Sequence, residues 1–245
     1  MSASHESAFE FDAFHCNRPT IAVGDVHGTI AWKNIVNRRR PGDRLIFLGD
    51  YFDRSGAGPF ASDEKDNFLE ICAYCRSNPD TYLLLGNHDY QYLPFASWPY
   101  YPWERRAQTL REALMQNLDL LNIIFVDEEA AKPLIFTHGG LCQTFMRNNR
   151  IQSVAEINSA WRSRPEIFDF VERDPQSGRE SDPFGDDPWQ TPIWTRLMAL
   201  TTDGVKGFNQ VVGHTVTLVP EIETTLHQDS FLTACTMDAT LIRLR

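Results

Sequence analysis

Carboxylate, amide and imidazole side chains recur in this sequence directly after short apolar runs. The apolar run 21–23 is followed by Gly24, then by Asp25 and His27. A carboxylate and an imidazole two residues apart at the end of a strand lie where a ligand can reach both side chains. This arrangement is typical of a metal site.

The same pattern occurs five times along the chain. If the apolar runs are strands, one edge of the sheet collects oxygen and imidazole ligands that suit divalent metals. Each residue alone has a structural explanation as a helix cap, a turn residue or a buried histidine, but their joint occurrence favours a metal site. The five segments are GDVHG (24–28), GDYFDR (49–54), GNHD (86–89), HGG (138–140) and GHT (213–215).

The elements that must position these side chains follow from the apolar periodicity. Alternating strands and helices in the first part of the chain favour a mostly parallel sheet. We expect strands over 21–23, 45–48 and 81–85, separated by helices over 30–39 and 63–77. Further on, we expect helices over 104–121, 141–148, 153–162 and 165–172, an irregular loop over 173–192, and strands over 123–126, 133–137, 209–213, 216–219, 231–236 and 240–244.

Length and charge limit the architecture and the partners. A chain of 245 residues that is 42% hydrophobic can bury one sizeable core, so we expect a single domain over 19–245 after a loosely held arm over 1–18. The net charge of -10 argues against duplex nucleic acid or an anionic membrane as a partner. We find neither the apolar core of a signal peptide nor a membrane span, so we expect a cytoplasmic protein.

The cysteines are odd in number and scattered, which is typical of a reducing compartment. Cys72 and Cys75 have C-x-x-C spacing, but they share a predicted helix with Phe68 and Ile71. We therefore favour packing over a redox or zinc role for this pair.

Residues 90–103 interleave aromatic side chains with prolines. We favour a small satellite core under a long loop. The alternative is a wall that stacks an aromatic leaving group such as a nucleobase or a tyrosine.

In their order along the chain, the five segments resemble the motifs of the calcineurin-like metallophosphoesterases, most closely those of the phosphoprotein phosphatase branch, which includes diadenosine tetraphosphatases. The segments span 24–215, which is most of the chain. The resemblance implies an α/β fold, a four-layer α/β/β/α sandwich, with two divalent metal ions at the strand ends. It implies Asp25 and His27 as ligands of the first ion, Asn87, His138 and His214 as ligands of the second, and Asp50 as the bridge between them.

The resemblance also implies roles in catalysis and in phosphate binding. It makes His88 the acid that protonates the leaving-group oxygen, with Asp53 holding its ring. It makes Arg54 a phosphate contact and Arg196, in Trp194-Thr195-Arg196, a second phosphate clamp.

Two departures from the family patterns bear on the substrate. Eukaryotic protein phosphatases usually have glycine at the position of Ser55 and glutamate, followed by an arginine, at the position of Asp89. One phosphate clamp is therefore absent or supplied elsewhere. The segment after His214 lacks the second histidine of the nuclease and cyclic-nucleotide branches, which favours monoester or anhydride hydrolysis over diester cleavage.

We therefore expect a phosphatase of the phosphoprotein type that hydrolyses phosphomonoesters by in-line attack of a metal-bridging hydroxide. A diadenosine polyphosphate or nucleotide hydrolase is one alternative, and a metal-loaded phosphate-binding protein without turnover is another. The set His88, Asp53 and Arg54 argues against the last, because a binder needs no proton donor. Manganese is favoured as the metal, with Fe, Zn, Co and Ni as alternatives.

Overall fold

Two β-sheets pack face to face in the computed structural model of the protein, which describes residues 9–10, 16, 18–54, 59–97, 105–130, 132–217, 222–224, 230–233 and 241–244. One sheet has the strand order β1-β11-β2-β3-β4-β5 and the other the order β6-β7-β8-β10-β9. The strands are β1 (Phe9–Glu10), β2 (Thr20–Val23), β3 (Arg44–Phe47), β4 (Thr81–Leu84), β5 (Leu121–Asn122), β6 (Ile124–Asp127), β7 (Leu134–Thr137), β8 (Asn209–Val212), β9 (Ile222–Thr224), β10 (Ser230–Thr233) and β11 (Leu241–Leu244).

Successive residues of the central strands enter different cores. Ile21 and Val23 of β2 pack in the core that includes α1 and α2, whereas Ala22 joins Ile46 and Phe136 in the core between the two sheets. Because both faces of these strands are covered, the strands consist of continuous apolar runs rather than an alternating pattern.

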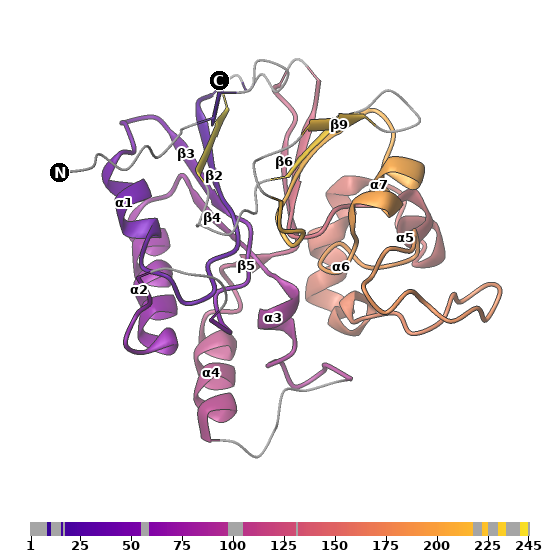
Figure 1. The fold of residues 1–245 in the computed structure, drawn as a ribbon, viewed down its shortest axis with the longest axis horizontal. Coiled ribbons are helices and arrows are strands. Elements are labelled where there is room, and N and C mark those ends of the chain that lie inside the picture. The colour runs from indigo at the N-terminus through magenta and orange to yellow at the C-terminus, as the bar shows by residue number, and fades with distance from the viewer. Residues whose placement is uncertain are drawn as a thin grey trace.

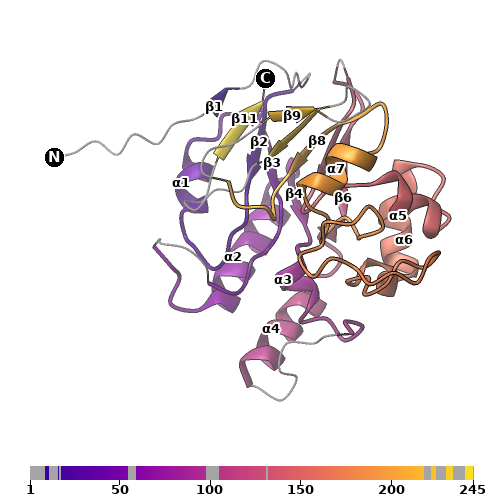
Figure 2. The ribbon, with the colours of Figure 1, turned by 45° about the vertical axis from the view of Figure 1, so that its right-hand side comes forward.

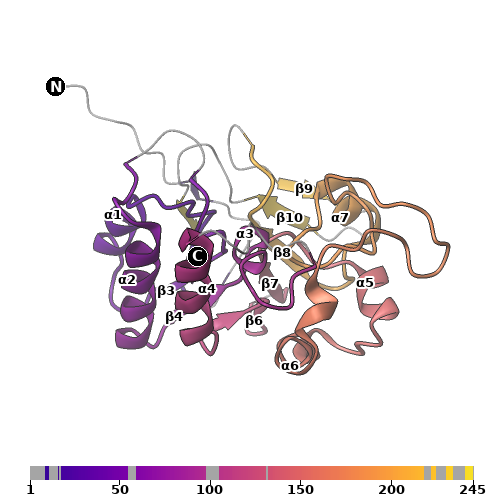
Figure 3. The ribbon, with the colours of Figure 1, turned by 90° about the horizontal axis from the view of Figure 1, so that it is seen from below.

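Helices cover the outer face of each sheet, as Figures 1 and 3 show. The resulting order of helices, sheet, sheet and helices is the predicted four-layer sandwich. The first sheet is covered by α1 (Trp32–Asn37), α2 (Glu64–Ser77) and α4 (Arg105–Gln116), and the second by α5 (Gln143–Asn148), α6 (Ile157–Ser163) and α7 (Leu197–Asp203), with α3 (Asn87–Tyr90) and the 3-10 helices Val154–Glu156 and Pro165–Phe168 in the connections.

Helix α2 begins and ends where the sequence predicts. The Asp63 side chain accepts a hydrogen bond from the Asp66 amide, which caps the first turn. The helix stops before Asn78-Pro79, because the residue before a proline is disfavoured in a helix. Cys72 and Cys75 lie on its buried face, and burial raises the pKa of Cys72 to about 12. Both thiols are packing residues, as predicted.

The predicted helix over 104–121 is wrong at its carboxyl end. Helix α4 stops at Gln116, and Leu121–Asn122 forms β5, which pairs in parallel with β4. The leucine stripe continues past Gln116, but pairing at the sheet edge overrides helical propensity there.

Other elements also differ from the sequence predictions. The predicted helix over 165–172 is only a 3-10 turn, Pro165–Phe168, and α7 and β9 were not predicted. Val216 and Thr217 are not in a strand, and 218–219 lie outside the described residues. Within the predicted arm over 1–18, Phe9–Glu10 forms β1, which pairs in parallel with β11 (Figure 2).

The topology brings the five motifs together. Strands β2, β3 and β4 are parallel in the first sheet, and β7 and β8 are parallel in the second. Because parallel strands end at the same edge, the loops after these five strands share one side of the sandwich.

Candidate metal centre

The carboxylates of Asp25 and Asp50 are each held by one backbone amide. The amide of His214 donates to Asp25 Oδ1 at 3.0 Å, and the amide of His88 donates to Asp50 Oδ1 at 2.9 Å. The other oxygen of each carboxylate faces His27: Asp25 Oδ2 lies 4.0 Å from His27 Nε2, and Asp50 Oδ2 lies 3.7 Å from it. Both carboxylates therefore present an oxygen to His27.

Two motif glycines make room for these carboxylates. A Cβ atom at Gly86 would overlap Asp50 Oδ1, and a Cβ atom at Gly213 would lie 2.5 Å from Asp25 Oδ1. A side chain at either position would displace the carboxylate, so the close approach of backbone to carboxylate explains both glycines.

Four of the predicted site residues have a left-handed backbone conformation. The φ angle is 42° at His27, 52° at Asp50, 63° at Asp53 and 60° at His214. Among the described residues, only Arg150 joins them as a non-glycine residue with positive φ. Each such residue costs about 1–3 kcal/mol and persists where the surrounding structure enforces it, typically at functional sites.

The rings of His27 and His138 are oriented by backbone carbonyls. His27 Nδ1 lies 2.9 Å from the Phe52 carbonyl oxygen, and His138 Nδ1 lies 2.9 Å from the Leu48 carbonyl oxygen. When Nδ1–H donates to these carbonyls, Nε2 points at Asp50 Oδ2, at 3.7 Å in His27 and 3.3 Å in His138. A histidine fixed in this way offers Nε2 as a metal ligand.

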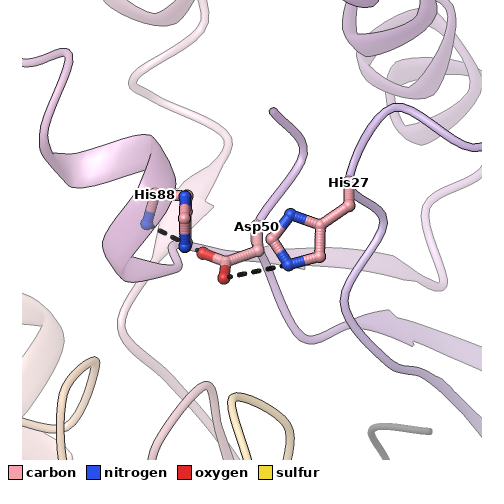
Figure 4. Close-up of side chains that lie close together, drawn as sticks. All are labelled: His27, Asp50 and His88. Atoms are coloured by element: carbon pink, nitrogen blue, oxygen red, sulfur yellow. Dashed lines mark hydrogen bonds and ion pairs between the residues drawn. The ribbon is translucent and has the colours of Figure 1, made fainter. Parts of the chain in front are cut away.

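Asp50 belongs to two groups of potential ligands. His27, Asp50 and His88 form one group, and Asp50, His138 and His214 form the other, with the ligand atoms of each group within 4.8 Å of one another. Figure 4 shows Asp50 between His27 and His88. Asn87 joins the second group, because its Oδ1 lies 2.9 Å from His138 Nε2. All six predicted metal ligands therefore lie together.

An unsatisfied nitrogen supports the fit of a cation to this site. His214 Nε2 is buried and has no hydrogen-bond partner within the described part of the chain. A buried polar atom without a partner costs free energy. A divalent cation among the ligands of the second group would supply the missing partner.

The protonation of His138 points the same way. Burial would lower the pKa of His138, but the carboxylates of Asp50 and Asp25 raise it to about 9. Burial would raise the pKa of Asp50, but the charge of His138 holds it well below its usual range. The buried carboxylates of Asp50 and Asp25 therefore favour positive charge at this site, which a divalent cation would supply.

His88 is bonded as a proton donor requires. Its Nδ1 lies 2.9 Å from Asp53 Oδ2, while Asp53 Oδ1 accepts from the Tyr92 hydroxyl at 2.6 Å and from Arg106 Nη2 at 3.0 Å. Burial would lower the pKa of His88, but Asp53 and Asp50 raise it to about 9. Asp53 therefore orients the His88 ring, and its charge favours the protonated imidazole.

The sequence did not predict the supporting residues Tyr92, Arg106 and Glu64. Arg106 Nη2 also donates to Glu64 Oε2 at 2.6 Å, and Glu64 Oε1 accepts from the Arg54 amide at 3.0 Å. One signal was present in the sequence: Arg105 and Arg106 stand in the first turn of α4, where the helix dipole disfavours cations. Such a pair indicates a compensating interaction elsewhere.

Asp89, in the third motif, fixes the loop that carries Asp50. Its fully buried carboxylate accepts hydrogen bonds from the amides of Asp50 at 2.8 Å, Tyr51 at 2.7 Å and Gly86 at 3.0 Å. Burial, together with the nearby charge of Asp50, raises the pKa of Asp89 to about 8. Asp89 therefore joins the second motif to the third.

The two predicted phosphate clamps contact backbone carbonyls. Arg54 Nη2 donates to the carbonyls of Ala61 and Ser62, and the Arg54 side chain is 44% exposed. Arg196 Nε donates to the Phe184 carbonyl. The pKa of His214 is held well below its usual value, first by burial, then by the charge of His138 and then by the charge of Arg196.

The described part of the aromatic segment forms a packed cluster. Tyr90 and Tyr92 are buried, and the Tyr90 ring lies 5.7 Å from Phe95 and 6.3 Å from Trp161 between centroids. Both tyrosines belong to the large core that also contains residues of α1 and α2. The prediction of packing is therefore confirmed for these residues, but that of a small separate core is wrong; 98–103 lie outside the described residues.

Comparisons with known proteins identify the family. Residues 18–217 match the family model of the calcineurin-like phosphoesterases, so the chain belongs to this family. The family, the two-sheet fold and the clustered ligands define a metallophosphoesterase-type hydrolase with a candidate divalent-metal site. A search of curated proteins found no match.

Solved structures with a similar fold include three phosphoesterase-related proteins. A serine/threonine phosphatase from Saccharomyces cerevisiae with similarity to human phosphatase PP5 has 14% identity and a TM-score of 0.48, covering 91% of this chain and 68% of its own. A putative diadenosine tetraphosphatase has 17% identity and a TM-score of 0.46, covering 89% and 83%. A putative 5'-nucleotidase from Staphylococcus aureus has 16% identity and a TM-score of 0.39, covering 92% and 50%.

The helices of the described residues do not meet the requirements of a membrane span. Within that part of the chain, every helix is too short or too polar to cross a bilayer.

Proposed function

We propose that the protein is a phosphatase with a dinuclear metal centre that hydrolyses phosphomonoesters, including phosphoproteins. One observation carries the proposal: Asp50 Oδ2 lies 3.7 Å from Nε2 of His27, in the first proposed ligand set, and 3.3 Å from Nε2 of His138, in the second. A carboxylate shared in this way is the usual means of holding two cations about 3.5–4 Å apart. When bound, such ions supply a nucleophilic water at neutral pH and neutralise charge on the phosphoryl oxygens.

The residues of the chain divide the remaining work. In our proposal Asp25 and His27 hold one ion, Asn87, His138 and His214 hold the other, and Asp50 holds both. His88 would keep Nδ1–H on Asp53 and deliver the proton of Nε2 to the leaving-group oxygen, which an alkoxide leaving group requires. The 2.9 Å hydrogen bond between His88 Nδ1 and Asp53 Oδ2 supports this orientation.

Arginines would bind the phosphate. Arg54 follows Asp53 directly in the second motif and its side chain is 44% exposed, while Arg196 lies near His214. We assign both to the phosphoryl oxygens, where a planar guanidinium forms two hydrogen bonds at once.

Metal analysis combined with a substrate panel tests the proposal. The purified protein is stripped with chelator, reloaded with Mn²⁺, and assayed on a phosphoserine peptide, an aryl phosphate and diadenosine tetraphosphate. We expect two ions per chain and hydrolysis of the two monoesters. Preferential cleavage of diadenosine tetraphosphate would support the nucleotide hydrolase instead. Phosphate binding without any turnover would support a binding protein.

A further inference from the structure

A pocket of about 660 Å³ opens at the amino-terminal ends of α2 and α4. These two helices lie side by side, as Figure 3 shows. Helices begin at the edge where the preceding parallel strands end, so the pocket lies on the same side of the sandwich as the candidate metal centre. Its volume falls within the range of about 300–1,000 Å³ that is usual for small-ligand sites.

The pocket shares walls with the candidate metal centre. Arg106, which lines the pocket, contacts Asp53, the partner of His88. Arg54, which also lines it, follows Asp53 directly and packs against the first motif: a Cβ atom at Gly28 would lie 3.3 Å from Arg54 Cγ. The pocket is therefore connected to the proposed acid through Arg106 and Asp53.

The lining is basic in an otherwise acidic chain. The whole chain has a formal charge of -10, yet the pocket has more basic than acidic residues. Charged groups of both signs are already engaged: Glu64 Oε2 pairs with Arg106 at 2.6 Å, Lys65 Nζ lies 3.3 Å from Asp66 Oδ1, and Asp63 caps α2. The charged lining residues are Arg54, Lys65, Arg105 and Arg106 on the basic side and Asp63 and Glu64 on the acidic side.

The helix geometry adds to this positive charge. Both α2 and α4 direct their amino-terminal turns into the lining. The end of α2 is compensated by Asp63, Glu64 and Asp66, whereas the first turn of α4 has no acidic residue and carries Arg105 and Arg106. The helix dipole and the basic side chains at the end of α4 together favour an anionic ligand.

We infer that this pocket binds a second anionic group of the substrate, a phosphate or a carboxylate, while the scissile phosphate occupies the metal centre. The inference rests on the proposed function and narrows its substrate class. The preferred substrates are phosphomonoesters that carry another negative group close to the phosphate.

Paired substrates test this inference. One pair consists of phosphoserine peptides that differ only in flanking glutamate or glutamine, and the other of a sugar bisphosphate and the matching monophosphate. The measured quantity is the ratio of kcat/KM within each pair. We expect the more anionic member to be preferred about tenfold in at least one pair, and the pair that responds identifies carboxylate or phosphate as the ligand.

Charge variants locate the preference in the pocket. The double variant Lys65→Glu/Arg105→Glu should abolish or invert the ratio, and the neutral variant Lys65→Gln/Arg105→Gln should give an intermediate ratio. Arg147→Glu/Arg150→Glu, outside the pocket lining, is the charge-matched control and should keep the wild-type ratio. Ratios near one for the wild-type enzyme, or equal changes in the pocket and control variants, would overturn the inference while leaving the proposed function intact.

A binding measurement separates the two proposals if no substrate is hydrolysed. In that case the proposed function fails, and calorimetry with inorganic pyrophosphate on chelator-treated protein decides the inference. Binding that is at least about tenfold weaker in Lys65→Glu/Arg105→Glu than in the control variant would support the pocket as an anion site. Equal affinity in both variants, or no binding to the wild type, would overturn it.

Discussion

The two ligand groups around Asp50 differ in their access to solvent. The His27 and His88 side chains are 17% and 32% exposed, whereas the His138 side chain is fully buried. The buried side is covered by the segment 192–195, since the amides of Gly139 and Gly140 donate to the Pro192 carbonyl. The proposed acid therefore lies on the open side, where a substrate can reach it.

The difference teaches how one carboxylate can serve two tasks. Asp50 Oδ2 lies 3.3 Å from the buried His138 and 3.7 Å from the more open His27. Its Oδ1 is fixed by the His88 amide at 2.9 Å. In the proposed centre the buried side would hold an ion and the open side would admit substrate, and Asp50 joins the two.

Removing the shared carboxylate should have the largest effect. In Asp50→Ala we expect both ions and all detectable turnover to be lost, because each group loses its common ligand. Metal content by mass spectrometry and turnover of an aryl phosphate measure this. Asp80→Ala, which removes a surface partner of Arg18, is the control and should retain metal and activity. Full metal loading of Asp50→Ala would contradict the shared-ligand assignment.

The two motif glycines should distinguish the two groups. Gly86→Ala pushes a methyl group against Asp50 Oδ1, so we expect both ions to bind about 10–100-fold more weakly. Gly213→Ala pushes a methyl group towards Asp25 Oδ1 instead, so we expect the first ion to weaken to that extent. The second ion should weaken less, through the neighbouring His214, whose amide donates to the same oxygen. Mn²⁺ titration calorimetry measures the two affinities. Identical behaviour of the two variants would show that the groups are not separable.

Replacing the proposed acid should affect catalysis alone. In His88→Asn we expect unchanged metal content and kcat about 10²-fold lower on alkyl phosphates, with a smaller loss on activated aryl phosphates. An activated leaving group needs less protonation, so the dependence on leaving group is the diagnostic readout. An equal loss on both substrate types would rule out the acid role.

Removing one support of Asp53 should have the smallest effect. Tyr92→Phe deletes the hydroxyl that donates to Asp53 Oδ1 at 2.6 Å but leaves Arg106 in place at 3.0 Å. We expect kcat on alkyl phosphates to fall about tenfold, the loss of one hydrogen bond to a charged group. Tyr82→Phe, in the core between the sheets, is the control. A loss as large as that of His88→Asn would mean that Tyr92 itself takes part in the proton transfer.

The sequence predicted the ligands better than their supports. Each ligand stands at the end of an apolar run, a local pattern that a single chain reveals. Tyr92 and Arg106 reach Asp53 from 39 and 53 residues away, and no local pattern encodes such a contact. Tyr92 was instead assigned to a small satellite core, whereas its ring packs against Phe52 in the large core.

The secondary structure shows the same division. Helix α2 has a capping aspartate at one end and a proline after the other, so its bounds could be predicted. Helix α7 is short and has no side-chain cap, and it depends on Ala199 and Leu200 packing with Val212 of the second sheet. Strand β5 replaced a predicted helical turn because β4 offered it a partner.

The sequence by itself determined the alternation of strands and helices, the residue types at the strand ends and the family to which the chain belongs, because these depend on neighbouring residues. Which ligand group is buried, which oxygen of Asp50 faces the histidines, and which helix ends line the basic pocket depend on the tertiary structure. Those features depend on contacts between residues far apart in the chain, and such contacts exist only once the two sheets have packed together.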